Sequence, residues 1–155
     1  MPGHIPVTEW LAGSQQEVKW YVGANHAGGY SYRLCKMPTN GISGLSEKCF
    51  QKTPLDFVGH NQWVVYGKDL SSGHRTKIVA NRTTEGTFPA GSMWTANPFR
   101  PPHEEGGNSG HGHGQVIDHL KIPGDLEPGS YVLSFRWDCK CSPQVWSVCS
   151  NILIA

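Results

Sequence analysis

Two neighbouring segments of the chain alternate between apolar and polar positions and meet at one histidine. In residues 17–24 every second residue is apolar, and residues 30–35 repeat this two-residue period. Such a period is typical of β-strands that bury one face. The link between them, residues 25–29, is rich in glycine and prone to turn. The pattern therefore predicts two strands joined by a short, rigid turn that carries His26.

Further strand patterns follow along the chain, separated by turns of Gly, Pro and Ser. The clearest covers residues 131–137, where four large apolar residues share one face. Other strands are expected at residues 63–66, 76–80, 92–95, 115–122 and 150–155, with an edge strand before Gly13. A helical period is not visible. Seven or eight short strands predict an all-β fold, an immunoglobulin- or fibronectin III-like antiparallel β-sandwich with long loops.

The composition supports a single domain covering residues 1–155. The chain has 19 Gly and 11 Pro, about a fifth of its residues against a usual share of roughly 12%. Its net charge is +1 and only 16% of its residues are charged, which gives no electrostatic case for nucleic acid or an anionic membrane. No apolar run approaches the roughly 20 residues that span a bilayer. We therefore expect a monomer without nucleic-acid or membrane partners.

The five cysteines fall into two local groups. They are Cys35 with Cys49, and Cys139 with Cys141 and Cys149. This spacing suits disulfides that close loops better than zinc, whose ligands usually come as close pairs. We expect one disulfide between Cys35 and Cys49 and one between Cys139 and Cys149. Disulfides, together with a glycosylation sequon at residues 81–83, favour a secreted protein, although the chain shows no signal peptide.

Residues 97–114 are poor in apolar residues and rich in Gly, Pro and His, which predicts a flexible loop. His103, His111 and His113 could bind a metal adventitiously, but a His-x-His on a flexible loop loses binding energy to ordering. His26 is the stronger candidate, since a rigid and accessible imidazole suits a metal ligand or an acid/base group. The alternative is that His26 caps the hairpin and bonds a loop carbonyl.

Three segments, ANHAGGYSYRLC, SYVLSFRWDC and QVWSVCSNI, resemble the copper-dependent lytic polysaccharide monooxygenases and their relatives with a type-4 chitin-binding domain. The resemblance covers residues 6–154 and implies an immunoglobulin-like sandwich with one copper in a histidine brace. The brace combines the amine and imidazole of an N-terminal histidine with a second histidine. Residues 24–26, followed by residues 29–33, match the motif of that second histidine. The resemblance thus makes His26 a metal ligand.

The resemblance also assigns residues near the last strand. Trp146 occupies the axial position, where Tyr or Phe is more usual, and Gln144 matches a glutamine that hydrogen-bonds the oxygen species. Trp137-Asp138 resembles a pair beneath the site of chitin-active members, and Cys149 resembles a disulfide cysteine. The simpler alternatives are core positions for both tryptophans and a loop hydrogen bond for Gln144.

The chain departs from the family at its start. It begins with Met1 instead of the ligand histidine, and His4 cannot replace that histidine because it has no free amine. We therefore expect residues 1–155 to be the C-terminal two-thirds of a larger domain and to be inactive alone. The full-length protein is expected to be secreted and to cleave an insoluble β-linked polysaccharide of the chitin or cellulose type, using copper and an external electron donor. The alternative is a non-catalytic polysaccharide-binding or cell-wall module in which Trp10, Trp63 or Trp94 stacks on sugars.

Overall fold

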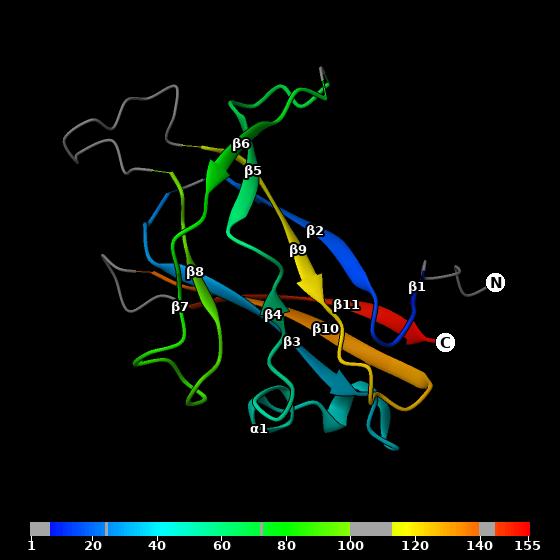
Figure 1. The fold of residues 1–155 in the computed structure, drawn as a ribbon. Coiled ribbons are helices and arrows are strands. Elements are labelled where there is room, and N and C mark those ends of the chain that lie inside the picture. The colour runs from blue at the N-terminus through cyan, green and yellow to red at the C-terminus, as the bar shows by residue number, and fades with distance from the viewer. Residues whose placement is uncertain (1–6, 24, 72, 100–112, 140–144) are drawn as a thin grey trace.

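The computed structural model describes residues 7–23, 25–71, 73–99, 113–139 and 145–155 (Figure 1). Within these ranges the chain forms eleven strands and two short helices. The strands are β1 (Thr8–Trp10), β2 (Gln15–Val22), β3 (Gly29–Lys36), β4 (Asp56–Phe57), β5 (Asn61–Tyr66), β6 (Thr76–Val79), β7 (Arg82–Thr83), β8 (Trp94–Ala96), β9 (Gly114–Lys121), β10 (Gly129–Asp138) and β11 (Val145–Ile154). The helices are η1 (Gly41–Gly44) and α1 (Glu47–Phe50). No described helix has the length and apolar character that a bilayer crossing requires.

The strands form two sheets that pack as a sandwich. Sheet A has the order β1-β11-β10-β3-β8-β7, and sheet B has the order β2-β9-β5-β6 with β4 also paired to β9. The predicted all-β sandwich is confirmed. Two details differ: β1 runs parallel to β11, and the strands outnumber the prediction. Several additional strands, such as β4 and β7, have only two residues, which is too short to show an alternating pattern.

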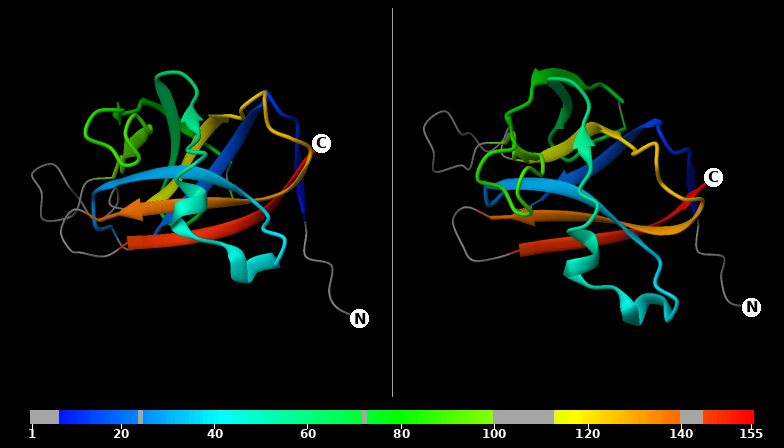
Figure 2. Two further views of the ribbon diagram at one scale, coloured as in Figure 1. Left: turned by 90° about the horizontal axis from the view of Figure 1, so that it is seen from below. Right: turned by 60° about the horizontal axis from the view of Figure 1, so that its bottom comes forward.

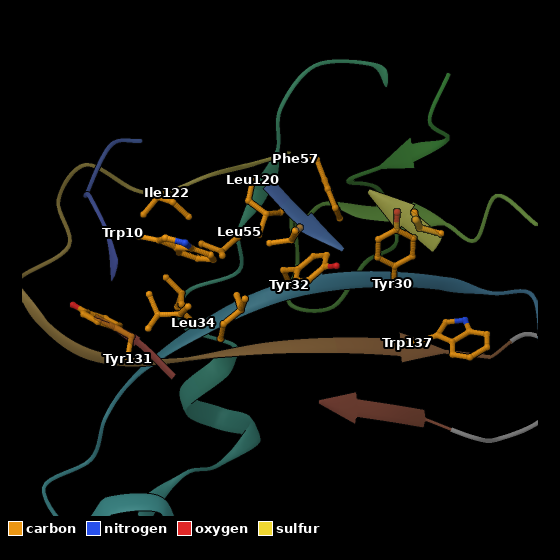
Figure 3. Close-up of a cluster of buried hydrophobic side chains, with 14 of the residues drawn as sticks. Trp10, Tyr30, Tyr32, Leu34, Leu55, Phe57, Leu120, Ile122, Tyr131 and Trp137 are labelled. Carbon is orange, nitrogen blue, oxygen red and sulfur yellow. The ribbon is translucent and has the colours of Figure 1, made fainter. Parts of the chain in front are cut away.

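The core between the sheets is built from the apolar faces that the alternation predicts. Val18 and Val22 of β2 face the aromatic row of β3, and β10 adds its own apolar row. Figure 3 shows these side chains extending from Trp10 and Tyr131 at one end to Trp137 at the other. Full burial of one such side chain stabilises the fold by about 1.5–3 kcal/mol. Trp10 is only 6% exposed, so its suggested role in stacking on sugars is wrong.

Strand β3 buries both of its faces, not one as the alternation suggests. Its second face, with Ser31, Arg33 and Cys35, is covered because η1 and α1 lie on the outer side of sheet A (Figure 2). The predicted disulfide between Cys35 and Cys49 is present and ties β3 to α1. The Nη2 of Arg33 donates a hydrogen bond to Oε2 of Glu47 in α1 at 2.9 Å. A polar position in a strand pattern is therefore not always a surface position.

The predicted disulfide between Cys139 and Cys149 is wrong. Cys149 lies in the middle of β11 with Ser134 as its register partner, and its exposed sulfur forms no disulfide. Cys139 follows Asp138, which pairs with Val145. The offset of more than four residues separates the two backbones by at least about 13 Å, because a strand rises about 3.3 Å per residue. A disulfide needs Cα atoms within about 7 Å; Cys141 lies outside the described residues.

Candidate functional site

His26 lies in the turn between β2 and β3, at the end of the sandwich opposite the C-terminus (Figure 1). Its side chain is half-buried. The turn crosses from one sheet to the other, because β2 ends at Val22 in sheet B and β3 begins at Gly29 in sheet A. The position agrees with the expectation of a histidine at a strand end, with its imidazole able to reach solvent.

Asn25 fixes the backbone on one side of His26. Its Oδ1 accepts a hydrogen bond from the backbone N–H of Ala27 at 2.9 Å, which closes an Asx turn around the histidine. The same oxygen accepts from Asn97 Nδ2 at 3.0 Å, and Asn25 Nδ2 donates to the carbonyl of Phe99 at 3.0 Å. The turn is thereby joined to residues 97–99. The sequence did not indicate this role for Asn97, although Asn next to a turn is a recognisable signal.

Ala27 and Gly28 fix the backbone on the other side. Both adopt left-handed conformations, with φ of 53° and 78°. A Cβ atom at Gly28 would lie 1.9 Å from the carbonyl oxygen of Asp138, so only glycine permits this close approach to β10. The backbone N–H of Asn97 also donates to the carbonyl of Gly28 at 2.8 Å. The turn is thus pressed against the end of β10.

Trp137 contacts the turn from the core of the sandwich. It is buried, and its Nε1 donates a hydrogen bond to the carbonyl of Ala27 at 2.7 Å. Its ring centroid lies 5.9 Å from that of His26, with 35° between the planes. The imidazole therefore sits on a rigid frame. This geometry agrees with both interpretations of Trp137, as a core residue and as a residue that lies beneath His26.

Charged residues beside the turn are paired with one another. Arg136 Nε donates to Asp138 Oδ1 at 2.8 Å, and Arg136 NH1 donates to Glu47 Oε1 at the same distance. The hydrogen bond to Asp138 raises the pKa of Arg136 above its ordinary value. The hydrogen bond from Arg33 to Glu47 lowers the pKa of that carboxyl to about 2. These groups hold the end of β10 against α1.

A second polar cluster lies inside the sandwich. The hydroxyl of Tyr30 donates to Asp118, and Gln62 Nε2 donates to that hydroxyl at 2.9 Å. Arg82 NH1 donates to Asp118 at 3.2 Å and to Thr95 Oγ1 at 2.9 Å. Burial raises the pKa of both Tyr30 and Asp118. Because this cluster is enclosed, we interpret it as structural. It could not be predicted from local sequence patterns, since its members lie far apart along the chain.

The remaining predicted site residues are only partly described. Trp146 is the register partner of Trp137 in β11, but its side chain lies outside the described part of the structure. Gln144 and residues 100–112, with His103 and His111, also lie outside it. His113 is half-buried just before β9, and its carbonyl accepts from the N–H of Gly67 at 3.1 Å. Their predicted roles stay predictions.

The turn presents one half-buried imidazole, that of His26. The described residues contain no group of three or more His, Cys, Asp or Glu side chains that could hold a metal ion. A single imidazole such as that of His26 suits copper chemically.

The chain is similar in sequence to known proteins over almost its whole length. No family model matches it. It is 26% identical over 168 residues to an AA13 family lytic polysaccharide monooxygenase A of Pyricularia oryzae, covering 98% of this chain and 43% of that protein. It is 29% identical over 175 residues to the protein of the same description from Aspergillus terreus, covering 99% and 42%. The chain thus spans less than half the length of these curated relatives.

A solved structure supports the same likeness at the level of fold. The AA15 lytic polysaccharide monooxygenase of Thermobia domestica in the Cu(I) state matches with a TM-score of 0.56 and 19% identity, covering 97% of this chain and 64% of that one. Such a low identity carries only the sandwich architecture. The chain is therefore lytic polysaccharide monooxygenase-like, similar to this group in sequence and in fold.

Proposed function

We propose that the protein to which residues 1–155 belong is a copper-dependent lytic polysaccharide monooxygenase in which His26 is a copper ligand. The observation that carries this proposal is the half-buried imidazole of His26 on a turn fixed by Asn25, Gly28 and Trp137. The similarity to two monooxygenases over almost the whole chain supports it. The other ligands, the amine and imidazole of an N-terminal histidine, would come from outside this chain. Residues 1–155 alone would then be inactive.

The rigidity of the turn makes the imidazole of His26 suitable as a metal ligand. A metal ligand on a flexible loop loses binding energy to ordering, whereas the turn of His26 is held by hydrogen bonds and a close approach to β10 within the chain itself. The indole N–H of Trp137 donates a hydrogen bond to the carbonyl of Ala27, the residue after His26. The indole ring also contacts the imidazole ring of His26. A copper ion bound there would supply one-electron redox chemistry, with an external electron donor to reduce it.

We further propose roles for two residues near the start of β11. Trp146 would line the metal site as an aromatic side chain that is not a strong ligand. Gln144 would be a hydrogen-bond donor beside the site. The backbone pairing of Trp146 with Trp137, whose ring contacts His26, supports this placement for Trp146.

The proposed substrate is an insoluble β-linked polysaccharide of the chitin or cellulose type, and the whole protein is proposed to be secreted and to act as a monomer. The disulfide between Cys35 and Cys49 supports an oxidising compartment. An exposed Phe88 and a half-buried Trp94 lie around a hollow of about 260 Å³ that also includes Gly29 and Asp138, next to the turn. Aromatic rings beside the site would suit contact with sugar rings.

The test uses the protein isolated from its source and the full-length gene expressed with the substitution His26→Ala. We expect the unaltered protein to bind one copper ion tightly, with a Cu(II) resonance spectrum that His26→Ala changes. Mass spectrometry should find oxidised sugars with the unaltered protein and with the control variant His60→Ala, but not with His26→Ala. His60→Ala is the matched control, because His60 is an exposed histidine directly before β5 of sheet B. An unchanged Cu(II) spectrum in His26→Ala would remove His26 from the site.

The substrate is tested separately with chitin, cellulose and starch as parallel substrates. Oxidised products from chitin or cellulose support the β-linked proposal. Products from starch alone would contradict it and leave the copper proposal intact.

The second candidate function is a non-catalytic polysaccharide-binding module. It is favoured by the single imidazole at the turn, since no three-residue metal cluster occurs among the described residues. Half-buried Trp63 and Trp94 would then be the stacking residues. Binding to insoluble glycan without copper and without oxidised products would support it over the first proposal.

A further inference from the structure

Asn81 lies on the surface where the chain crosses from sheet B to sheet A. Strand β6 of sheet B ends two residues before it, and β7, at the outer edge of sheet A, begins directly after it (Figure 1). The backbone is held by both sheets. The N–H of Ala80 donates to the carbonyl of His60 at 2.8 Å, and the carbonyl of Asn81 accepts from the N–H of Ala96 at 2.8 Å. Asn81 therefore has a fixed position at the rim of the sandwich.

The side chains around Asn81 alternate between the interior and the surface. Arg82 points between the sheets, where its guanidinium donates to Asp118 and Thr95. Successive residues of an extended segment point to opposite sides, so Asn81 and Thr83 share the outward side, and both are exposed. The carboxamide of Asn81 forms no hydrogen bond with any described residue. A bulky group attached to it would therefore displace no hydrogen bond within the described part of the chain.

Residues 81–83 have the sequence Asn-Arg-Thr, which is the acceptor triplet for N-linked glycosylation. No other asparagine of residues 1–155 begins such a triplet. Triplets of this kind arise often by chance, and many would be buried or occupied in the folded protein. A glycan is bulky and solvated, so it needs an asparagine that stays on the surface after folding. Asn81 meets this requirement.

We propose that Asn81 carries an N-linked glycan in the native protein. The transfer forms a bond between Nδ2 of Asn81 and the anomeric carbon of the glycan. It breaks the bond from that carbon to the diphosphate of a lipid-linked donor in the secretory pathway, and Nδ2 loses one proton. The inference rests on the part of the proposed function in which the protein is secreted. It does not depend on copper.

The glycan lies on the outer face of sheet A, beside the turn of His26. Ala96, which is hydrogen-bonded to Asn81, is the register partner of Gly29 at the end of that turn. Neighbouring strands lie about 4.8 Å apart, so the backbones of Asn81 and Gly29 are about 10 Å apart. The glycan also stands next to β7, the last strand of sheet A. A large solvated group there hinders the addition of a further strand.

Mass spectrometry of the full-length protein isolated from its source tests this proposal. Trypsin cuts after Lys77 and Arg82, and so releases residues 78–82 as one peptide. We expect this peptide to be missing at its unmodified mass. After the protein is treated with a peptide N-glycosidase in heavy-oxygen water, the peptide should appear with residue 81 converted to aspartate and one heavy oxygen, because the enzyme hydrolyses the bond to the glycan.

A matched set of substitutions in the full-length protein, expressed through a eukaryotic secretory pathway, sharpens the test. Thr83→Ala and Asn81→Gln should each remove the glycan mass from the peptide. Thr83→Ser should keep it, since serine also completes the triplet. Thr84→Ala is the control, because Thr84 is an exposed threonine directly outside the triplet, and it should keep the glycan.

Two results would overturn the glycan proposal. They are an unmodified peptide of residues 78–82 in the native protein, and a glycan on this peptide that Thr83→Ala leaves in place. The state of Cys35 and Cys49 in the native sample separates this failure from a failure of the proposed secretion. An unmodified Asn81 with the disulfide formed would remove the glycan alone, whereas an unmodified Asn81 with two free thiols would remove the secretion proposal as well. Copper binding, measured on the same sample, decides the metal site independently.

Discussion

The two long sides of the sandwich differ in how the space between the sheets is closed. On the side of β6 and β7, Arg82 bridges the sheets, with its guanidinium bonded to Asp118 and Asn61 of sheet B and to Thr95 of sheet A. On the side of β1 and β2, a groove of about 580 Å³ opens between β2 and strands β10 and β11, and the buried hydroxyl of Tyr32 nearby has no partner among the described residues. On the first side these hydrogen bonds join the two sheets, although the Nε of Arg82 is buried and has no hydrogen-bond partner among the described residues. On the second side the core is open to the groove.

Removing Arg82 should have the largest effect on this contrast. Arg82→Met leaves the carboxylate of Asp118 buried without its cation, which should reduce the free energy of unfolding by about 3–5 kcal/mol. Urea unfolding measures this difference. Arg75→Met is the control, because Arg75 pairs with Glu17 where both side chains are 36% exposed; it should cost less than about 1 kcal/mol. Equal losses of unfolding free energy in Arg82→Met and Arg75→Met would contradict the role of Arg82 as a bridge between the sheets.

Two neighbouring tyrosines of β3 provide a more conservative comparison. Tyr30→Phe removes a hydroxyl that Asp118 and Gln62 both use, and we expect a loss of about 1–3 kcal/mol. Tyr32→Phe removes a hydroxyl without a partner among the described residues, so in residues 1–155 it should be neutral or slightly stabilising. Denaturant unfolding of both variants checks this order. A loss in Tyr32→Phe as large as that in Tyr30→Phe would mean that its hydroxyl already has a partner.

The smallest effect is expected at the rim of the groove. A hydrogen bond from Arg75 lowers the pKa of Glu17 to about 2, below its ordinary value of about 4.5. Its contribution to stability is therefore present above pH 4.5 and lost as the pH falls toward 2. Because Glu17 is more than a third exposed, we expect less than about 1 kcal/mol.

Unfolding of the Glu17→Gln variant between pH 7 and pH 2 measures this contribution. The variant should lose less stability than the unaltered chain as the solution is acidified. A larger loss in the variant would reverse the sign of the expected effect.

The sequence predicted those parts of the fold that local alternation controls. Strands β2, β3 and β10 and their buried faces follow from the two-residue period. The disulfide between Cys35 and Cys49 follows from their proximity in sequence. The covered second face of β3 was not predictable in this way, because α1 returns to it from a different part of the chain.

Contacts between distant residues explain the other gaps. Tyr30 and Asp118 are 88 residues apart, and no local pattern relates them. The turn of His26 was found because its residue types suit a turn, but its anchoring on Phe99 and Trp137 depends on pairings across the sandwich. The Cys139–Cys149 pairing failed for a related reason, since closeness in sequence is lost when β11 extends the chain.

The Gly28 contact makes the candidate site depend on a position that has no side chain. The carbonyl of Asp138 occupies the space that a Cβ atom would need. Even alanine at residue 28 would therefore clash with this carbonyl, although Gly28 itself neither binds a ligand nor takes part in a reaction. A designer who grafts this turn onto another sandwich must transfer the facing strand end as well, because the orientation of the imidazole depends on both.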